Sequence, residues 1–151
     1  MATSDANVLY FEDLGEGTVQ WGVECVVNQT EMIEYALKND PLPMHIDEQA
    51  ARTSPYGSLI ASSGFTISLW FRSSIPIARR LAVIGALEWR FTLPRPVYAG
   101  NRLRNKWTVV SKRLSSRPGR GVLTTKQELL NERDEPVLVC DGVILVATKP
   151  G

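Results

Sequence analysis

The pattern of apolar and polar positions predicts strands throughout the second half of the chain. Apolar side chains occupy every other position across 87–93, which is the two-residue period of a half-buried strand. Segments 102–114, 121–131 and 137–146 are rich in apolar and β-branched residues and are separated by turn-forming sequences, so each is predicted to be a strand. The last of them is apolar on both faces near its ends, which indicates a central place in the sheet.

The first half begins with one strand pattern and then changes to a helical period. Residues 18–27 (TVQWGVECVV) favour a single strand because they are rich in Val and Trp. Asn28, with Glu31 three positions later, has the form of a capping box and predicts the start of a helix. This helix should end within 38–40, because Pro41 disfavours helical geometry at the residue before it.

Two more helices are predicted before the strands of the second half. Asp47 is a good N-cap and should begin a short helix, and residues 54–57 (SPYG) should form a turn. Residues 59–71 are apolar or small on nearly every side, which is typical of a buried helix. The order of a strand, helices and four strands predicts an α+β fold, in which a mostly antiparallel sheet wraps one buried helix.

Length and composition suit one globular domain that spans residues 1–151. Hydrophobic residues make up 44% of the chain and charged residues 22%. We expect the polar residues 1–7 to be frayed. No apolar run approaches the roughly 18–20 residues needed to cross a bilayer, and the N-terminal segment lacks the apolar core of a secretory signal, so no membrane partner is expected. Cys25 and Cys140 lie in apolar, strand-like stretches, which predicts two buried free thiols and favours a cytoplasmic location.

Charge is distributed unevenly, although the formal net charge is only +1. Residues 1–80 hold 5 basic and 10 acidic side chains, a net of −5, whereas residues 81–151 hold 12 and 6, a net of +6. The second half lacks a basic run with interleaved aromatic residues, so nucleic acid is not an expected partner. The basic residues are either solvated strand edges or contacts to a phosphate-bearing ligand, and the candidates for the second role are Arg90, Arg95, Arg102, Arg104 and Lys106.

The chain contains one histidine, His45, five residues after Asp40. Pro41 and Pro43 stiffen the connector between them, so both side chains should have defined directions. A carboxylate and an imidazole held together can share acid–base work on one water molecule near neutral pH. The alternative is an aspartate at a helix end and an unrelated surface histidine. No Cys or His nearby completes a metal-ligand set, so no metal site is expected, and the cysteines look like core residues rather than nucleophiles.

A second candidate feature is the small-residue segment 61–64 (ASSG). If the buried helix begins there, its first backbone N–H groups are unpaired and can bind an anion or a polarised carbonyl oxygen. The other interpretation is structural: Ser62 caps the helix, and Gly64 only packs against a neighbouring element. Ile60, Phe65, Leu69 and Trp70 could line a ligand's apolar chain or simply fill the core.

Several of these segments, in the same order, resemble the MaoC-like dehydratases. Residues 39–47 (NDPLPMHID) resemble the hydratase motif of that family, and residues 54–62 (SPYGSLIAS) resemble the segment before its central helix. Residues 10–17 are similar to the family's opening, and 89–100 to its strand and Pro-Val-x-x-Gly turn. The resemblance covers nearly the whole chain, which makes it far more specific than the spacing of Asp40 and His45 alone.

The resemblance implies a hot-dog fold, in which a curved antiparallel sheet wraps a long central helix, and a homodimer or higher homo-oligomer. It implies reversible hydration of a trans-2-enoyl thioester to a 3-hydroxyacyl thioester, carried by coenzyme A or acyl carrier protein, with no further cofactor. Asp40 and His45 match the catalytic pair of the family. The amide that binds the thioester oxygen falls on Ser63, or on Gly64 if the register shifts by one residue.

The sequence departs from the family pattern at two places. Leu42 stands where Asn or Gln is usual, and the family often has His-Gly or Ser-Gly one position before Ser63-Gly64. Two other functions are therefore considered. A non-catalytic subunit that binds acyl thioesters is consistent with Leu42. A thioesterase of the same fold would usually carry a carboxylate on the central helix, and 59–71 contains no Asp or Glu.

Overall fold

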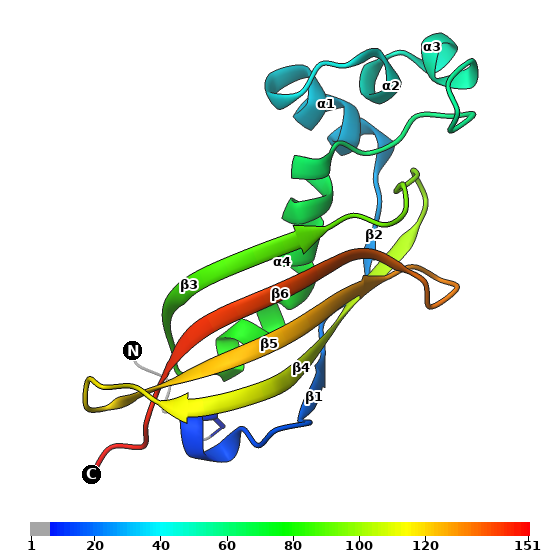
Figure 1. Cartoon of the computed structure of the whole chain (residues 1–151). Helices are drawn as coiled ribbons and strands as arrows, with labels where there is room; N and C mark the ends of the chain where they lie inside the picture. Colours follow the sequence, from blue (N-terminus) through cyan, green and yellow to red (C-terminus); the bar gives the residue numbers. More distant parts are fainter. Residues whose placement is uncertain (1–6) are drawn as a thin grey trace, which may run out of the picture.

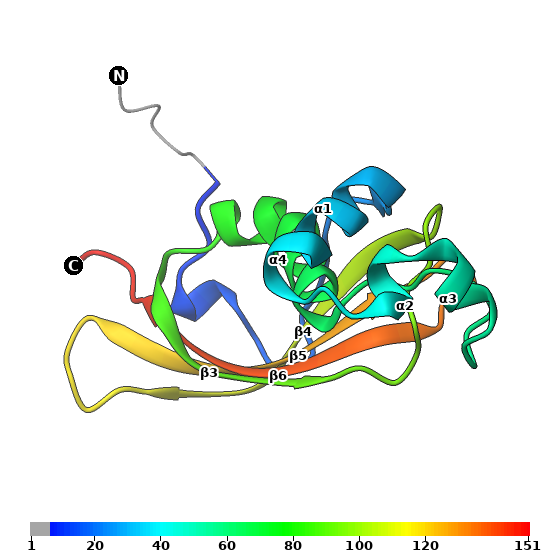
Figure 2. The same ribbon diagram turned by 90° about the horizontal axis from the view of Figure 1, so that it is seen from above.

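A curved antiparallel sheet holds one long helix in its concave face (Figures 1 and 2). The computed structural model describes residues 7–151. Five strands follow one another across the sheet in the order β1-β4-β5-β6-β3, and β2 pairs separately with β4. The strands are β1 (Val19–Trp21), β2 (Cys25–Val26), β3 (Val83–Thr92), β4 (Arg102–Leu114), β5 (Arg120–Leu130) and β6 (Pro136–Ala147). The predicted α+β class, a curved antiparallel sheet around a central helix, is confirmed.

The strands β4, β5 and β6 match their predicted ranges to within about one residue, whereas β3 begins four residues before the predicted start at 87. Each of the pairs β4–β5, β5–β6 and β6–β3 is antiparallel. As predicted, β6 lies inside the sheet, because β5 pairs with one of its edges and β3 with the other. The strand β3 therefore forms one edge of the sheet, and its outer edge has no partner strand within residues 7–151.

The prediction of one continuous strand over 18–27 is wrong, because the segment breaks at Gly22 into β1 and β2. The Gly22 N–H donates to the Asn105 carbonyl of β4 (2.8 Å), whereas the next N–H, of Val23, donates to the Ser73 carbonyl (2.9 Å). The backbone of Gly22 lies so close to Ser73 that a side chain at position 22 would overlap it. The chain thus leaves the sheet at this point to contact the central helix.

Three short helices lie together beyond one end of the sheet (Figure 1). They are α1 (Gln29–Asn39), α2 (Pro43–Ile46) and α3 (Glu48–Arg52). Asn28 caps α1 as predicted, accepting from the Glu31 N–H (3.0 Å), and α1 ends where Pro41 requires. Asp47 caps α3 as predicted. The sequence did not predict α2.

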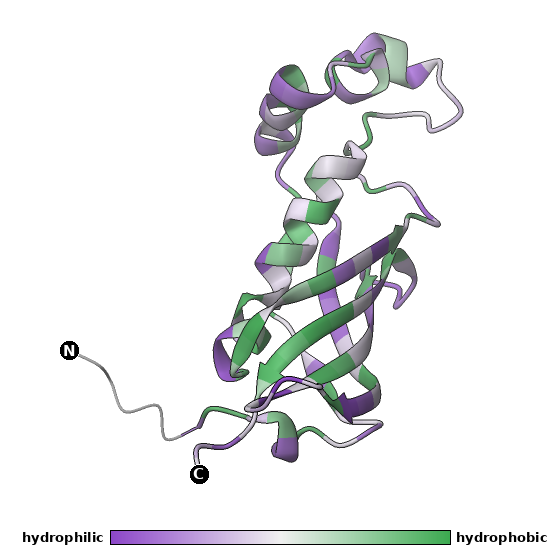
Figure 3. Cartoon of the chain, turned by 60° about the vertical axis from the view of Figure 1, so that its left-hand side comes forward, coloured by the Kyte–Doolittle hydropathy of each residue, from purple (hydrophilic) through white to green (hydrophobic). Residues whose placement is uncertain are grey.

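The central helix α4 (Ser63–Arg80) begins four residues after its predicted start and ends nine residues after its predicted end at 71. Residues 59–62 are extended because the Ala61 N–H donates to the Val97 carbonyl (2.8 Å) and Ile60 forms an isolated bridge with Tyr98. The helix continues across Pro76, which the apolar pattern did not reveal, and two arginines complete its last turn. Figure 3 shows more hydrophilic ribbon in α1–α3 than in the central strands.

The core consists of two clusters of buried apolar residues along α4. One surrounds its N-terminal half and includes Leu69 and Trp70, and the other surrounds its C-terminal half and includes Ile77. Both cysteines are buried free thiols, as predicted, and burial raises the pKa of each, that of Cys140 to about 12. No helix within residues 7–151 is long and apolar enough to cross a membrane.

Candidate active site

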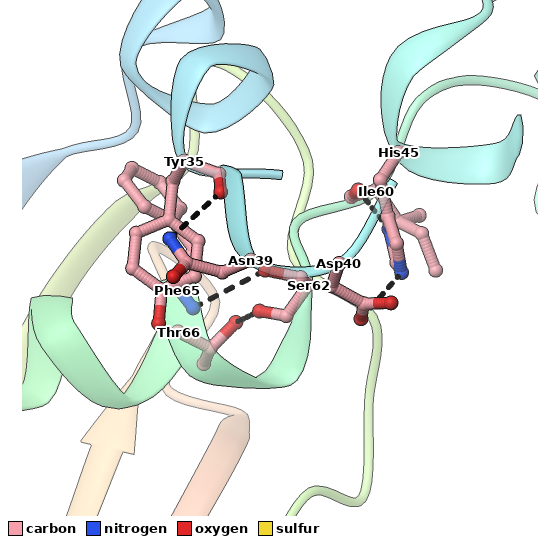
Figure 4. Close-up of polar contacts among 8 residues, drawn as sticks. All are labelled: Tyr35, Asn39, Asp40, His45, Ile60, Ser62, Phe65 and Thr66. Atoms are coloured by element: carbon pink, nitrogen blue, oxygen red, sulfur yellow. Dashed lines mark hydrogen bonds and ion pairs between the residues drawn. The ribbon is translucent and has the colours of Figure 1, made fainter. Parts of the chain in front are cut away.

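Asp40 and His45 come together because the chain folds tightly between them. Asp40 is the C-cap of α1, and His45 lies on α2, which begins at Pro43. The Leu42 N–H donates to the Asp40 carbonyl (2.8 Å) and the His45 N–H to the Leu42 carbonyl (2.9 Å). Figure 4 shows the two side chains facing each other, with Asp40 Oδ2 3.5 Å from His45 Nε2. The sequence prediction that the proline-braced connector joins this pair is therefore confirmed.

The imidazole of His45 is held by a backbone group from another segment. Its Nδ1 lies 2.8 Å from the Ile60 carbonyl oxygen (Figure 4), which can only accept a hydrogen bond. Nδ1 therefore carries a proton, and Nε2 is the ring nitrogen that can exchange a proton with a ligand. The His45 side chain is 6% exposed and the Asp40 side chain 39%, so solvent reaches the pair from the aspartate side.

The N-terminus of α4 faces the same region and is capped by Ser62. Ser62 Oγ accepts from the Phe65 N–H (3.3 Å), and the Ser62 carbonyl accepts from the Thr66 N–H (3.0 Å). Within residues 7–151 no hydrogen bond is made by the backbone N–H groups of Ser63 and Gly64. These two amides belong to the first turn of a helix, where the partial positive charge of the helix dipole is strongest.

Both interpretations of segment 61–64 are thus partly realised. Ser62 is fully buried and caps the helix, which is the structural role. Gly64 packs so closely against the Tyr35 hydroxyl of α1 that a methyl group at position 64 would overlap it. Ser63, in contrast, is exposed and lines the cavity described next, so its amide is the better placed of the two for a ligand.

A cavity of about 410 Å³ joins these groups. Asp40, His45 and Ser63 all line it. The remaining wall is contributed by residues from the α1–α2 connector, the segment before α4, α4 itself and the chain after β3: Leu42, Met44, Tyr56, Ile60, Ala61, Thr66, Leu93, Pro94, Arg95, Pro96 and Val97. An acid–base pair and a free helix amide therefore share one partly apolar cavity, which is the usual composition of a small-molecule site.

The structure does not gather the basic residues that were candidates for binding phosphate. Of the five, Arg95 alone lines the cavity, and its Nε already lies 3.3 Å from the Glu135 carboxylate. Arg90 is exposed on β3 beside Glu88 (3.4 Å). The other three lie around Trp21 and Glu24: Arg102 pairs weakly with Glu24, and Arg104 and Lys106 stack on Trp21. Contacts from Arg90 and Arg95 to a thioester's phosphates stay a prediction.

Sequence reasoning missed three contributors to the cavity wall. Thr66 is 2% exposed and donates from its hydroxyl to the Ser62 carbonyl (3.1 Å). The neighbours of Arg95 also line the cavity (Leu93, Pro94, Pro96 and Val97), and the Ile60 carbonyl orients His45. A backbone carbonyl has no signature in a sequence, whereas the turn at 96–100 was visible as a motif but not as part of the site. Of the four residues considered for an apolar wall, only Ile60 lines the cavity; Phe65, Leu69 and Trp70 belong to the core.

Comparison with known families agrees with the resemblance drawn from the sequence motifs. Residues 15–130 match the family described as MaoC like domain. The chain belongs to this family. A MaoC-like dehydratase from Rhodospirillum rubrum superposes with a TM-score of 0.84 at 30% identity, covering 95% of this chain and 99% of that one. The resemblance drawn from the motifs at 39–47 and 54–62 is thereby confirmed.

Two further comparisons for this MaoC-like chain are informative. A protein described as UPF0336 from Mycolicibacterium paratuberculosis is 28% identical over 120 residues, which are 75% of this chain and 71% of that protein. A Mycobacterium tuberculosis protein with a double hot-dog fold superposes with a TM-score of 0.79 at 20% identity and supports the fold alone. The match covers 96% of this chain but 47% of that protein, as expected if this chain is one hot-dog unit.

Proposed function

We propose that this MaoC-like protein is a hydro-lyase that reversibly adds water to a trans-2-enoyl thioester. The observation that carries the proposal is the approach of Asp40 Oδ2 to His45 Nε2 (3.5 Å) on a cavity that Ser63 also lines. The match to the MaoC like domain and the similarity to the Rhodospirillum rubrum protein, which is named a dehydratase, support the same class of reaction.

The geometry suggests how the reaction would proceed. A water molecule hydrogen-bonded to both Asp40 and His45 would give up a proton to one of them as its oxygen bonds to C3 of the substrate. The other group would return a proton to C2, and dehydration would reverse these steps. Negative charge would develop on the thioester oxygen, where the Ser63 N–H is available to stabilise it. One such donor is typically worth about 3–4 kcal/mol of activation free energy.

The handle of the thioester would be coenzyme A or acyl carrier protein. The cavity of about 410 Å³ is within the size range of small-molecule sites, so it would hold the reacting carbons and part of the acyl chain rather than the whole substrate. Arg95 lies at its wall and is 42% exposed in its side chain, so it could exchange Glu135 for a phosphate of the handle.

Replacing Asp40 by Asn tests the proposal directly. The carboxamide keeps the shape of the side chain but cannot accept a proton, so hydration should fall by about 10²–10⁴-fold. The measurement is the loss of absorbance of the conjugated enoyl thioester across a panel of chain lengths. Asp47→Asn is the matched control, because Asp47 only caps α3 and Asn is an equally good cap. Full activity in Asp40→Asn would remove this residue from the mechanism.

A non-catalytic subunit that binds acyl thioesters is the second candidate. Leu42 lines the cavity and is 46% exposed, so an apolar side chain occupies a place where the family usually has an amide. Tight binding of acyl-CoA without turnover across the same panel would favour this function. A thioesterase is disfavoured, since α4 carries no Asp or Glu along its whole length.

The same fold suggests how two copies would assemble. The strand β3 is an edge of the sheet, and Val83, Ile84 and Leu87 on it are each more than 40% exposed. Such an edge invites pairing with another strand. Antiparallel pairing of two β3 strands would join two sheets into one and give a homodimer, for which light scattering of the purified chain is the direct test.

A further inference from the structure

A layer of polar residues divides the core beneath the middle of α4. On β4, Asn105 lies between Leu103 of one apolar cluster and Trp107 of the other. On β5, Thr125 and Gln127 lie between Leu123 and Leu129 in the same way. Ser73 and Ser74 occupy the corresponding turn of α4. We call Ser73, Ser74, Asn105, Thr125 and Gln127 the polar layer. Because these five residues come from three elements and occupy one level of the core, we consider them as one group.

Hydrogen bonds within the polar layer fix the orientation of the Gln127 side chain. Gln127 Oε1 accepts from Trp70 Nε1 (3.0 Å) and from Asn105 Nδ2 (2.8 Å). Reversing the amide would set its NH₂ group against two donors, so this orientation is determined. Its Nε2 is therefore the free end of the side chain, and it makes no hydrogen bond to any group within residues 7–151. Gln127 as a whole is only 3% exposed.

Other members of the polar layer are also incompletely paired. Asn105 Oδ1 and Thr125 Oγ1 are buried and have no hydrogen-bond partner in the described part of the chain. Both residues are fully buried. Native cores contain few such groups because each costs free energy, and each one calls for an explanation. A layer with two buried hydrogen-bonding groups that lack a partner is poorly explained by core packing alone.

An apolar cavity opens beside the polar layer. It has a volume of about 120 Å³ and lies between the C-terminal half of α4 and the first half of β3. Trp70, Trp89 and Trp107 contribute to its walls, and Gln127 lines it. Apolar cavities of about 150 Å³ hold a benzene-sized molecule, so roughly five or six heavy atoms fit here. The cavity shares no lining residue with the one that contains Asp40 and His45.

We infer that this second cavity binds a small apolar group that carries one hydrogen-bond-accepting oxygen, and that Gln127 Nε2 donates to that oxygen. The aromatic walls supply apolar contact, and the free amide selects a ketone, ester, ether or alcohol over a plain hydrocarbon. The group is either a separate small molecule or the distal end of the acyl chain of a thioester bound at Asp40 and His45. The latter source rests on the proposed function.

Two-dimensional NMR of the amide and indole N–H groups of the full chain tests the binding. The probes are cyclopentanone and methylenecyclopentane, which have the same ring and differ by an oxygen in place of a carbon. Cyclopentanone should shift the Gln127 side-chain and Trp70 indole signals saturably and leave Trp21, 43% exposed on β1, unchanged. It should bind roughly three- to tenfold more tightly than the hydrocarbon, the effect of about one net hydrogen bond. Absence of saturable shifts at these signals in the unaltered protein overturns the inference.

Two variants test separately the hydrogen bond from Gln127 and the space that the cavity provides. Gln127→Leu should bind both probes equally, and a ketone preference that survives this change also overturns the inference. Ala86→Phe should abolish binding of both, since Ala86 lines the cavity at the exposed side of β3 and makes no contact with the polar layer's hydrogen bonds. Retained binding of both probes in Ala86→Phe would place the ligand elsewhere and contradict the assignment.

Turnover identifies the source of the oxygenated group. If the cavity holds the acyl tail, saturating cyclopentanone should raise KM at least threefold for a dodecenoyl-CoA that carries a keto oxygen near the end of its chain and leave KM for crotonyl-CoA unchanged. If it holds a separate molecule, neither KM should rise. Failure of every enoyl-CoA to react would count against the proposed function, whereas the NMR result on Gln127 would stand by itself.

Discussion

The helical end of the molecule, α1–α3 with the chain up to Ser62, and the sheet strands β3–β6 are built by different physical means. The helical end is held by individual polar contacts, such as the hydrogen bond from His45 Nδ1 to the Ile60 carbonyl (2.8 Å). The sheet is held by continuous antiparallel ladders and by fully buried side chains such as Leu123. Changes of single polar atoms at the helical end should therefore reduce function. Removal of side-chain volume from the core of the sheet should instead reduce stability.

The largest expected effect is the replacement of His45 by Gln. The Gln amide can still donate to the Ile60 carbonyl, so the helical end should keep its structure. The amide cannot, however, exchange a proton near neutral pH. Hydration should fall by about 10²–10⁴-fold. Circular dichroism and the urea midpoint should stay close to those of the unaltered protein. A large loss of stability in this variant would show that the two regions are not separable.

The converse change is Leu123→Ala in β5. Leu123 is fully buried and belongs to the core cluster around the C-terminal half of α4, away from the Asp40–His45 cavity. Unfolding free energy should fall by about 2–5 kcal/mol, measured by urea denaturation, with KM for the thioester unchanged. Ile144→Val on the paired strand is a milder companion that should cost about 1 kcal/mol. A changed KM for crotonyl-CoA in either variant would contradict the division of roles.

A smaller effect should follow at the junction of the two regions, where Ser62 caps α4. Ser62→Ala removes the acceptor of the Phe65 N–H and should cost about 1–2 kcal/mol of stability. Activity should fall only modestly, because the Ser63 amide remains at the first turn of the helix. Ser62→Asn, which keeps a capping oxygen, is the matched control for the stability measurement. Equal stability of the Ala variant and the unaltered protein would rule out the capping contribution.

The smallest effect, on thiol labelling, compares the two-residue strand β2, which leads into the helical end, with the interior of the sheet and needs no mutation. Cys25 lies in β2, beside α1, whereas Cys140 lies in the interior strand β6. Burial raises the pKa of both thiols, that of Cys140 to about 12, so little reactive thiolate is present at pH 8 in the folded protein. Iodoacetamide should label Cys25 before Cys140, as mass spectrometry of timed samples will show. Equal rates would mean that the interior strand β6 opens as readily as the short strand β2.

The sequence was most informative where one physical signal dominated. The strands β4, β5 and β6 were predicted within about one residue because long alternating runs bounded by turns leave little choice. The start of α1 followed from Asn28, and its end from Pro41. The Asp40–His45 pair was predicted because prolines restrict the few residues between them.

Prediction failed where distant segments decide the local structure. The break at Gly22 depends on the Ser73 carbonyl, and the extended form of 59–62 depends on Val97. Neither partner is near in sequence. The Leu59–Phe71 pattern was apolar enough for a helix, yet its first four residues lie outside α4, and two of them, Ile60 and Ala61, pair with other chain segments. The buried amide of Gln127 was also not foreseen, since a glutamine in a strand normally faces water.

The double use of Ile60 has a practical consequence for altering this protein. Its carbonyl fixes the imidazole of His45, whereas its side chain forms part of the cavity wall. The backbone there is anchored by the neighbouring Ala61 N–H to Val97, which no side chain at position 60 affects. Residue 60 can therefore be exchanged for smaller or larger apolar side chains to reshape the cavity, while the histidine keeps its orientation.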